Sequence, residues 1–300
     1  MLNKAKSACG GKKVKIAVIG GSGLYDLEGL KNVEEVVVST PYGKPSDSII
    51  CGELDGVGVA FLPRHGRGHR ILPSEVNSRA NIYALKSIGV ERIISVSACG
   101  SLKEEKYPTD IVVPSQIFDN TKQRGRSTFF GEGVVAHVPL AEPFCGELSD
   151  ILYKTVEETG ARAHKGGTFV VIEGPRFSTK AESMFYRSLG ADIVGMTAMP
   201  EAFLAREAEI CYATMAHVTD YDVWKKGEEV NTEKVISNFN KNIAKAKQIL
   251  KNIIPRLSSE RSCLCRDALR GAVMTDKKYI NPAMRKKLGV IMDKYMPEEK

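Results

Sequence analysis

Residues 14–24 read VKIAVIGGSGL, an apolar run that passes directly into glycines and a serine. The run has the length and the β-branched content of a buried strand. Glycines directly after such a strand let backbone N–H groups turn toward a bound anion. The spacing matches neither GxGxxG nor GxxxxGK[ST], so it supports neither a dinucleotide site nor a triphosphate site. Taken alone, the segment fits a tight structural turn as well as it fits an anion site.

Further β-branched runs follow along the chain and alternate with helical patterns. This alternation is typical of an α/β sheet and not of a helical bundle or a β-sandwich. Helices are expected over residues 73–88 and along an apolar stripe from 235 to 253. The remaining strands are expected at residues 57–63, 92–98, 111–114, 168–173, 192–196 and 210–218. We therefore expect one large α/β domain spanning residues 14–257.

The charge of the 300-residue chain is concentrated at its two ends. Of the net charge of +7, residues 1–13 contribute +4 and residues 256–300 contribute +5, so the remainder carries about −2. A basic groove for nucleic acid is therefore not supported. We interpret residues 1–13 as a basic, solvated N-terminal tail and residues 258–300 as a basic C-terminal extension.

Cellular location and metal content are constrained by the apolar runs and by the cysteines. No apolar run approaches the roughly 20 residues that span a bilayer, and the first residues lack the apolar stretch of a secretion signal, so a cytoplasmic protein is expected. The seven cysteines form no CxxC pair, which predicts reduced thiols and no metal site. Cys263 and Cys265 form a CxC motif in the polar extension, where they are interpreted as redox partners or a labile clip.

Two strand ends carry residues suited to an anion. Residues 63–69, PRHGRGH, combine two arginines, two histidines and two glycines, and no acidic residue lies nearby in the sequence. Arginine offers a planar fork to an oxyanion and glycine allows close approach, so anion binding is favoured over a solvated loop. Residues 97–100, SACG, end another expected strand. There Cys99 is interpreted as a small buried hydrophobic residue and not as a nucleophile.

Three later segments add an aromatic ring and carboxylates. They are EGPRFS at 173–178, GMTAMPE at 195–201 and TDYD at 219–222. In isolation, Asp220 and Asp222 would be turn or cap residues and Phe177 a core aromatic. Because all three segments follow expected strands, we expect them to meet the anion site at one edge of the sheet. The combination fits a heterocycle joined to a group that phosphate can attack.

Eight sequence blocks together resemble a known family. The blocks GGSGLYD, PRHGRGH, NSRANIYALKSIG, SACGSL, AHVPLAEPFC, IEGPRFS, GMTAMPE and TDYDVW have the order and spacing of methylthioadenosine phosphorylases, within the trimeric purine nucleoside phosphorylase family. The resemblance covers residues 14–255. It implies a nucleoside phosphorylase-like single domain with a twisted mixed central sheet flanked by helices. It also implies a homotrimer or a dimer of trimers, inorganic phosphate as co-substrate, and neither an organic cofactor nor a metal.

The resemblance also implies roles for individual residues. Asp220 would be the catalytic acid, which is held protonated, or shares a proton, at the nitrogen of the purine's five-membered ring. The phosphate would be bound by Ser22, Arg64, His65, Ser97, Ala98 and Thr197. The nucleoside would be bound by His137, Phe177, Ser178, Met196, Asp220, Asp222, Thr232 and Val235, with His137 reaching a neighbouring subunit's pocket.

The expected reaction is phosphorolysis of 5′-methylthioadenosine to adenine and 5-methylthioribose 1-phosphate, in purine and methionine salvage, with adenosine as a further substrate. Three departures from the family, Ser97, His217 and Thr232, leave open a broad-specificity enzyme that also uses inosine or guanosine. The sequence also leaves open a nonenzymatic nucleoside-binding protein and a hydrolase. By resemblance to some archaeal members, Cys145 with Cys211 and Cys263 with Cys265 would form disulfides.

Overall fold

The computed structural model describes residues 9, 14–21, 23–24, 26–122, 127–228, 232–258 and 260–296. Within these residues, eleven strands form one mixed sheet with six α-helices around it. The strands are β1 (Ile16–Gly20), β2 (Lys31–Val36), β3 (Ile49–Leu54), β4 (Val57–Pro63), β5 (Arg92–Ser101), β6 (Ile111–Val113), β7 (Gln116–Asn120), β8 (Ala163–Lys165), β9 (Thr168–Ile172), β10 (Ile193–Gly195) and β11 (Cys211–Asp220). The helices are α2 (Ser78–Ser87), α3 (Gly146–Glu158), α4 (Lys180–Ser188), α5 (Glu201–Glu207), α6 (Thr232–Ile253) and α7 (Pro282–Leu288). The expected single α/β domain with a mixed sheet is confirmed.

The centre of the sheet is built from parallel strands that end at the same edge. Strand β1 lies between β4 and β5 and is parallel to both. Strand β11 runs parallel to β5 along nearly its whole length, with an irregularity between Val218 and Asp220. Because parallel strands share their carboxyl ends, the residues that follow β1, β4 and β11 lie along one edge of the sheet, and ligands of open α/β sheets bind at such an edge.

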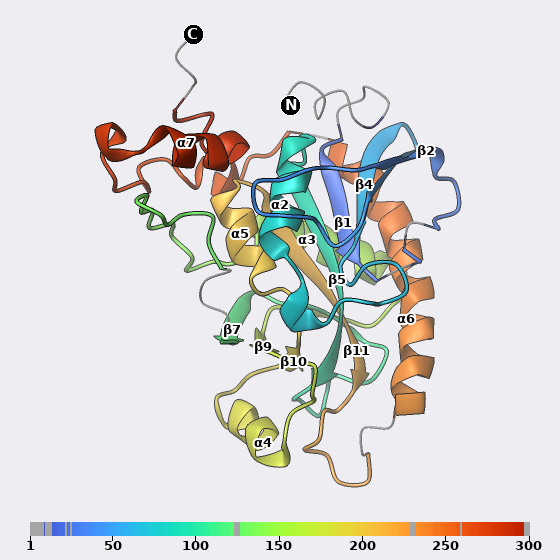
Figure 1. Cartoon of the computed structure of the whole chain (residues 1–300). Helices are drawn as coiled ribbons and strands as arrows, with labels where there is room; N and C mark the ends of the chain where they lie inside the picture. The colour runs from blue at the N-terminus through green and yellow to red at the C-terminus, as the bar shows by residue number, and fades with distance from the viewer. Residues whose placement is uncertain are drawn as a thin grey trace.

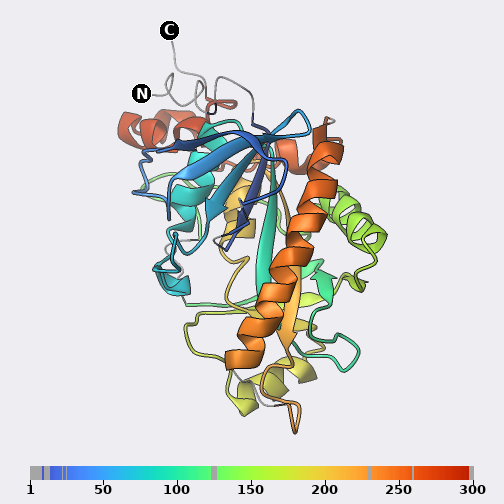
Figure 2. The same cartoon turned by 90° about the vertical axis from the view of Figure 1, so that its right-hand side faces the viewer.

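Alternate residues of β1 face opposite sides of the sheet, and each side has its own core. Ala17 and Ile19 pack in a cluster that includes residues of α2 and α5. Ile16 and Val18 pack in a second cluster with residues of α3 and α6. Figure 1 shows α2 and α5 on one side of the sheet and α6 on the other, and Figure 2 shows α6 crossing the sheet with α3 beside it. This two-sided burial explains why β1 is apolar at every position.

The C-terminal extension packs onto the domain. It contains α7 and short 3₁₀ turns, and Leu269, Met284 and Leu288 are buried in the same core cluster as α2 and α5. The extension also pairs with an earlier segment, because the His137 N–H donates to the Ala272 carbonyl over 2.8 Å. In the described part of the extension, α7 is thus accompanied by single 3₁₀ turns. Within the described residues, none of the helices has the length and apolarity that crossing a bilayer requires.

The cysteines are arranged differently from the pairing that the family resemblance implied. The disulfide of this structure joins Cys9 to Cys51, whereas Cys145, Cys211, Cys263 and Cys265 are free thiols. The bridges expected between Cys145 and Cys211 and between Cys263 and Cys265 are therefore wrong for this structure. The reason is geometric, because all four sulfur atoms lie within 4.8 Å of one another and do not separate into two bonded pairs.

Candidate functional site

The loop after β4 begins directly beside the end of β1. Gly20 is paired with Pro63 in the sheet, and the Arg64 N–H donates to the Gly20 carbonyl over 2.8 Å. The loop then turns through Gly66 and Gly68, which have φ values of 68° and 80°. A side chain at Gly66 would be strained in this conformation and would place its Cβ 3.3 Å from the Ser46 carbonyl oxygen. The glycines of PRHGRGH thus shape the loop at the carboxyl edge of the sheet.

Arg64 is buried and is held by the protein itself. Its Nε donates to Glu201 Oε1 over 2.5 Å and its Nη2 to Glu201 Oε2 over 3.0 Å. Further bonds go from Nη1 to the Val96 carbonyl over 3.0 Å and from Nη2 to Ser95 Oγ over 2.7 Å. Together these bonds occupy four of the five guanidinium N–H groups. Arg64 therefore lies at the expected edge, but most of its hydrogen-bonding capacity is directed inward.

Both arginines of this loop have acidic partners, although no acidic residue lies nearby in the sequence. Glu201 neutralises Arg64 from 137 positions along the chain, and Arg67 forms ion pairs with Glu35 and Asp47. Glu201 lies at the start of α5 and is itself 2% exposed. These partners are not apparent from the sequence, because they are distant along the chain and only the fold brings them together. A net positive charge in this loop therefore cannot be the basis of anion binding here.

His65 is held in its neutral form. Burial and the nearby Arg64 charge lower the pKa of His65 to about 4. Its Nδ1 lies 2.9 Å from the Ile71 carbonyl oxygen, which can only accept, so Nδ1 carries the proton. The Nε2 atom is then an acceptor and can take a hydrogen bond from a protonated phosphate oxygen.

Two hydroxyls expected to bind phosphate lie in contact. Thr197 Oγ1 donates to Ser97 Oγ over 2.8 Å, and Ser97 Oγ lies 3.3 Å from Ser95 Oγ. Since Ser95 also accepts from Arg64, a continuous hydrogen-bonded chain joins Arg64 to Thr197. The structure thus brings together Arg64, Ser97 and Thr197, which come from three separate sequence blocks.

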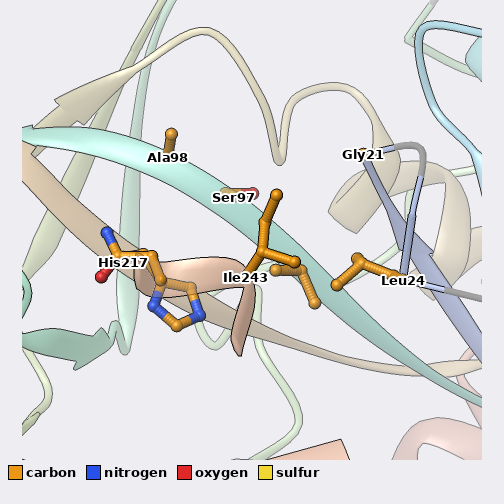
Figure 3. A pocket seen from close by; sticks show the side chains of 8 residues that line it. Gly21, Leu24, Ser97, Ala98, His217 and Ile243 are labelled. Carbon is orange, nitrogen blue, oxygen red and sulfur yellow. The ribbon is translucent and has the colours of Figure 1, made fainter. Parts of the chain in front are cut away.

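A small pocket of about 30 Å³ lies beside these hydrogen-bonded side chains and is lined by Ser97. Figure 3 shows Ser97 and Ala98 on β5 beside His217 of β11, with Leu24 and Ile243 at the apolar end. His217 is 3% exposed, neither of its ring nitrogens has a protein partner within the described residues, and burial lowers its pKa to about 3. A neutral imidazole therefore faces this pocket, at a position where the family resemblance predicts an apolar residue.

Asp220 lies at the end of β11, where the strand register shifts. Its Oδ1 accepts from the Asp222 N–H over 2.7 Å and its Oδ2 from Thr219 Oγ1 over 2.6 Å. Burial nevertheless raises the pKa of Asp220, with these bonds acting in the opposite direction. Gly100 makes room for the carboxyl, because a Cβ there would come within 3.0 Å of Asp220 Oδ1. Each carboxyl oxygen keeps one further lone pair for a ligand, and burial makes the carboxyl easier to protonate than an aspartate in water.

Asp222 contributes to this arrangement through its backbone N–H. It is 4% exposed, and burial raises its pKa while the hydroxyls of Ser183 and Ser178 lower it. Its φ of 50° lies in the left-handed region, and this turn directs its N–H to Asp220. Ser178 is thus beside Asp222 and not at an exposed edge. Asp222 thus positions Asp220 through its backbone N–H, and the nucleoside contacts expected of Asp222 and Ser178 stay predictions.

Phe177 and Met196 lie in the segments that follow β9 and β10. Phe177 is 55% exposed and so is not the core aromatic that its motif alone would suggest. Met196 lines a second pocket of about 30 Å³ that also contains Glu173 and Pro200. Gly174 packs against Met196, since a Cβ at Gly174 would lie 2.6 Å from its sulfur. An accessible aromatic ring and a thioether thus follow β9 and β10.

The structure does not gather every expected residue. His137 is exposed, and its segment pairs with the extension through Ala136 and Val273, away from α6 (Figure 1). Ser22 lies outside the described residues. Thr232 and Val235 belong to α6, but their side chains are outside the described part.

The residues that the sequence did not indicate are chiefly those that contact the site residues and hold them in place. Glu201 fixes Arg64 and accepts a further bond from the Tyr212 hydroxyl over 2.8 Å. Thr219 and Ser183 act on the two aspartates. The signal available for Glu201 was its place at the end of GMTAMPE, directly after an expected strand. No comparable pattern indicates Tyr212, which lies inside an apolar strand.

A sequence model described as the Phosphorylase superfamily matches residues 15–255. The chain belongs to this superfamily. The match leaves residues 256–300 outside it. The site described above lies entirely within the matched region.

Individual relatives can be aligned with this chain over most of their length. An S-methyl-5′-thioadenosine phosphorylase from Geobacter sulfurreducens is 52% identical over 282 residues, covering 94% of this chain and 99% of its own. The crystal structure of a methylthioadenosine phosphorylase from an antarctic soil metagenomic library is 50% identical, with a TM-score of 0.89 over 93% of this chain and 99% of that one. A methylthioadenosine phosphorylase from Schistosoma mansoni in complex with adenine is 38% identical, with a TM-score of 0.81 over 87% and 99% of the two chains.

Proposed function

We propose that this superfamily member cleaves 5′-methylthioadenosine by phosphorolysis, giving adenine and 5-methylthioribose 1-phosphate. The observation that carries the proposal is Asp220, a carboxyl with a raised pKa at the carboxyl edge of the sheet. Breaking the bond between the sugar and the purine leaves negative charge on the base. A protonated carboxyl donates to the five-membered-ring nitrogen and removes that charge.

Phosphate is proposed as the nucleophile and co-substrate. One of its oxygens forms the new bond to the anomeric carbon as the bond to the purine nitrogen breaks. Ser97 Oγ accepts from Thr197 and keeps its own proton to donate to the phosphate, and the neutral His65 accepts from a protonated phosphate oxygen. The pair between Arg64 and Glu201 holds these elements in place and leaves one guanidinium N–H for the anion. The reaction needs neither a metal nor an organic cofactor in this proposal.

The base is proposed to be an aminopurine. A protonated Asp220 donates through one oxygen, and its other oxygen accepts from an exocyclic amine. Phe177, exposed at 55%, offers a face for the base, and Met196 is proposed to meet the ribose. The adenine complex of the Schistosoma mansoni relative agrees with this choice.

A broader specificity that includes adenosine, inosine or guanosine is the second candidate. It is favoured by His217, whose buried ring offers a donor and an acceptor within a pocket that an apolar residue would make hydrophobic. Thr232 would add a hydroxyl from α6. We rank this candidate second because the relatives reported above are named for methylthioadenosine.

The assembly and the location belong to the same proposal. We propose a homotrimer, or a dimer of trimers, in which His137 completes a neighbouring subunit's pocket, since His137 is exposed and its segment pairs with the C-terminal extension. A cytoplasmic location is proposed because that compartment keeps thiols reduced and five of the seven cysteines are free.

The test is a comparison of kcat/KM for 5′-methylthioadenosine, adenosine, inosine and guanosine, each with saturating phosphate. We expect 5′-methylthioadenosine to be the preferred substrate. Asp220→Ala should lower kcat by about 10²- to 10⁴-fold. Asp150→Ala, which removes an exposed aspartate paired with Lys165, is the matched control and should leave kcat unchanged. Inosine as the preferred substrate, or equal activity of the two variants, would reject the proposal.

A further inference from the structure

Four cysteine side chains converge at the end of β11 opposite to Asp220. The sulfur atoms of Cys145, Cys211, Cys263 and Cys265 all lie within 4.8 Å of one another, with Cys211 and Cys263 at 3.2 Å. Strand β11 has ten residues, so about 30 Å of strand separates the cluster from Asp220. The cluster is therefore distinct from the candidate active site.

The four thiols come from three separate parts of the chain, each fixed by backbone contacts. Cys145 immediately precedes α3, and its N–H donates to the Tyr212 carbonyl over 2.9 Å. Cys211 opens β11, and its N–H donates to the Glu91 carbonyl over 2.9 Å. Cys263 and Cys265 belong to the C-terminal extension. Leu264 between them is 85% exposed, so the two thiols turn inward while it points outward.

The start of the extension is attached to the domain through Arg261 and Ser262. Ser262 donates through its N–H and its hydroxyl to Glu147 Oε2, over 3.0 and 2.5 Å. Arg261 Nη1 donates to the Glu209 carbonyl over 2.8 Å. These contacts hold Cys263 and Cys265 against the other two thiols without any covalent bond.

The distances suit a tetrahedral metal site better than two disulfides. A disulfide requires a sulfur separation of about 2.05 Å. Four thiolates at about 2.3 Å from a zinc ion lie about 3.8 Å apart. The sulfur–sulfur distances need to change by about 1 Å or less to reach this arrangement. No two of the four cysteines are joined by a disulfide.

The surrounding charge also suits a metal–thiolate centre. Arg206 Nη1 donates to Cys265 Sγ over 3.4 Å, and Arg261 Nη1 approaches Cys211 Sγ at 3.9 Å. One zinc ion with four thiolates carries a net charge of −2, which two guanidinium groups balance. Such donors to coordinating sulfur are a common second layer around metal ligands. Two neutral disulfides would give Arg206 no charge to offset here, whereas Arg261 also pairs with Glu91 over 3.5 Å.

We propose that Cys145, Cys211, Cys263 and Cys265 bind one Zn²⁺ ion, which attaches the C-terminal extension to the start of α3 and β11. Four protein ligands close the coordination sphere, so the site is structural and not catalytic. Binding releases the thiol protons as the four thiolates form, and no oxidant is needed. The expectation of no metal site arose because the ligands are spread over 120 positions of sequence, from Cys145 to Cys265.

The test uses the full-length protein, reduced, freed of metal with a chelator and then titrated with Zn²⁺ or Co²⁺. We expect one equivalent to bind, tetrahedral thiolate–cobalt absorption bands, and a higher melting temperature with metal. The double variant Cys263→Ser/Cys265→Ser should lose stoichiometric binding, and Arg206→Leu should weaken it by about 10- to 100-fold. Cys99→Ala, which removes a buried free thiol outside the cluster, should bind one equivalent as before.

Two results would overturn the proposal. The first is that the reduced protein takes up no Zn²⁺ or Co²⁺. The second is that the double variant binds as much metal as Cys99→Ala, which would place the metal elsewhere. Titration of the thiols in the reduced, metal-free protein confirms beforehand that all four are available, so a negative result cannot be attributed to disulfides.

Discussion

Removing the carboxylate of Glu201 should destabilise the protein strongly. In Glu201→Leu, the bonds from Arg64 Nε, from Arg64 Nη2 and from the Tyr212 hydroxyl are lost together. The two charged side chains are only 4% and 3% exposed, so the remaining guanidinium becomes an uncompensated buried charge. Breaking a buried pair in this way lowers the free energy of unfolding by about 3–5 kcal/mol, compared with about 1 kcal/mol for one ordinary hydrogen bond.

Two control variants separate charge burial from lost packing. The double variant Arg64→Met/Glu201→Leu removes both charges and should recover most of the lost stability, because well-packed apolar residues replace a buried pair at little cost. Glu35→Leu breaks the exposed pair with Arg67 and should change stability little. Urea unfolding at one fixed protein concentration, followed by circular dichroism, gives all the values. The reasoning fails if Glu201→Leu is no less stable than Glu35→Leu, or if the double variant is as unstable as the single one.

Three further predictions concern the candidate site and a buried carboxyl. Asp220→Asn should shift preference from adenosine toward inosine by about ten- to a hundredfold, since the amide donates where the carboxylate accepted; an unchanged ratio of the two kcat/KM values would refute it. Thr197→Val should raise the KM for phosphate about fivefold, the equivalent of one hydrogen bond of about 1 kcal/mol, without altering the KM for the nucleoside; equal changes in both constants would contradict this. Burial raises the pKa of Glu207 from 4.5 to about 7. Its contribution to the free energy of unfolding is therefore fully present below pH 4.5. That contribution falls by about 3 kcal/mol as the pH rises through 7. Urea unfolding of Glu207→Gln between pH 4.5 and 7.5 should show a smaller fall than the parent protein, and an identical fall would disprove the assignment.

Sequence patterns predicted the central strands well. Strand β4 begins at Val57 and ends at Pro63 as expected, and β1 and β11 lie within one or two residues of their expected bounds. These strands are buried on both faces, so their apolar runs are unambiguous. Strand β2, with the sequence KNVEEV, was missed because it is largely exposed at the edge of the sheet and carries charges. Edge strands leave little hydrophobic pattern to detect.

The site was predictable where residues follow strands, and unpredictable where they are paired across the fold. Thr197 follows β10 and Asp220 ends β11, whereas Ser97 lies within β5, which continues to Ser101 beyond its expected end; the sheet brings Ser97 and Thr197 into direct contact. The partner of Arg64 could not be inferred, because Glu201 comes from a distant helix start. The thiol cluster was missed for the same reason, since spacing rules recognise ligands only when they are close in sequence.

The central claim is that the chain transfers a sugar from a purine to phosphate. The most direct test is adenine release from 5′-methylthioadenosine in the presence and absence of phosphate, with the sugar product identified by mass spectrometry. The account predicts that release requires phosphate and yields one 5-methylthioribose 1-phosphate for each adenine. Equal release in phosphate-free buffer, with free 5-methylthioribose as the product, would contradict the account and indicate a hydrolase.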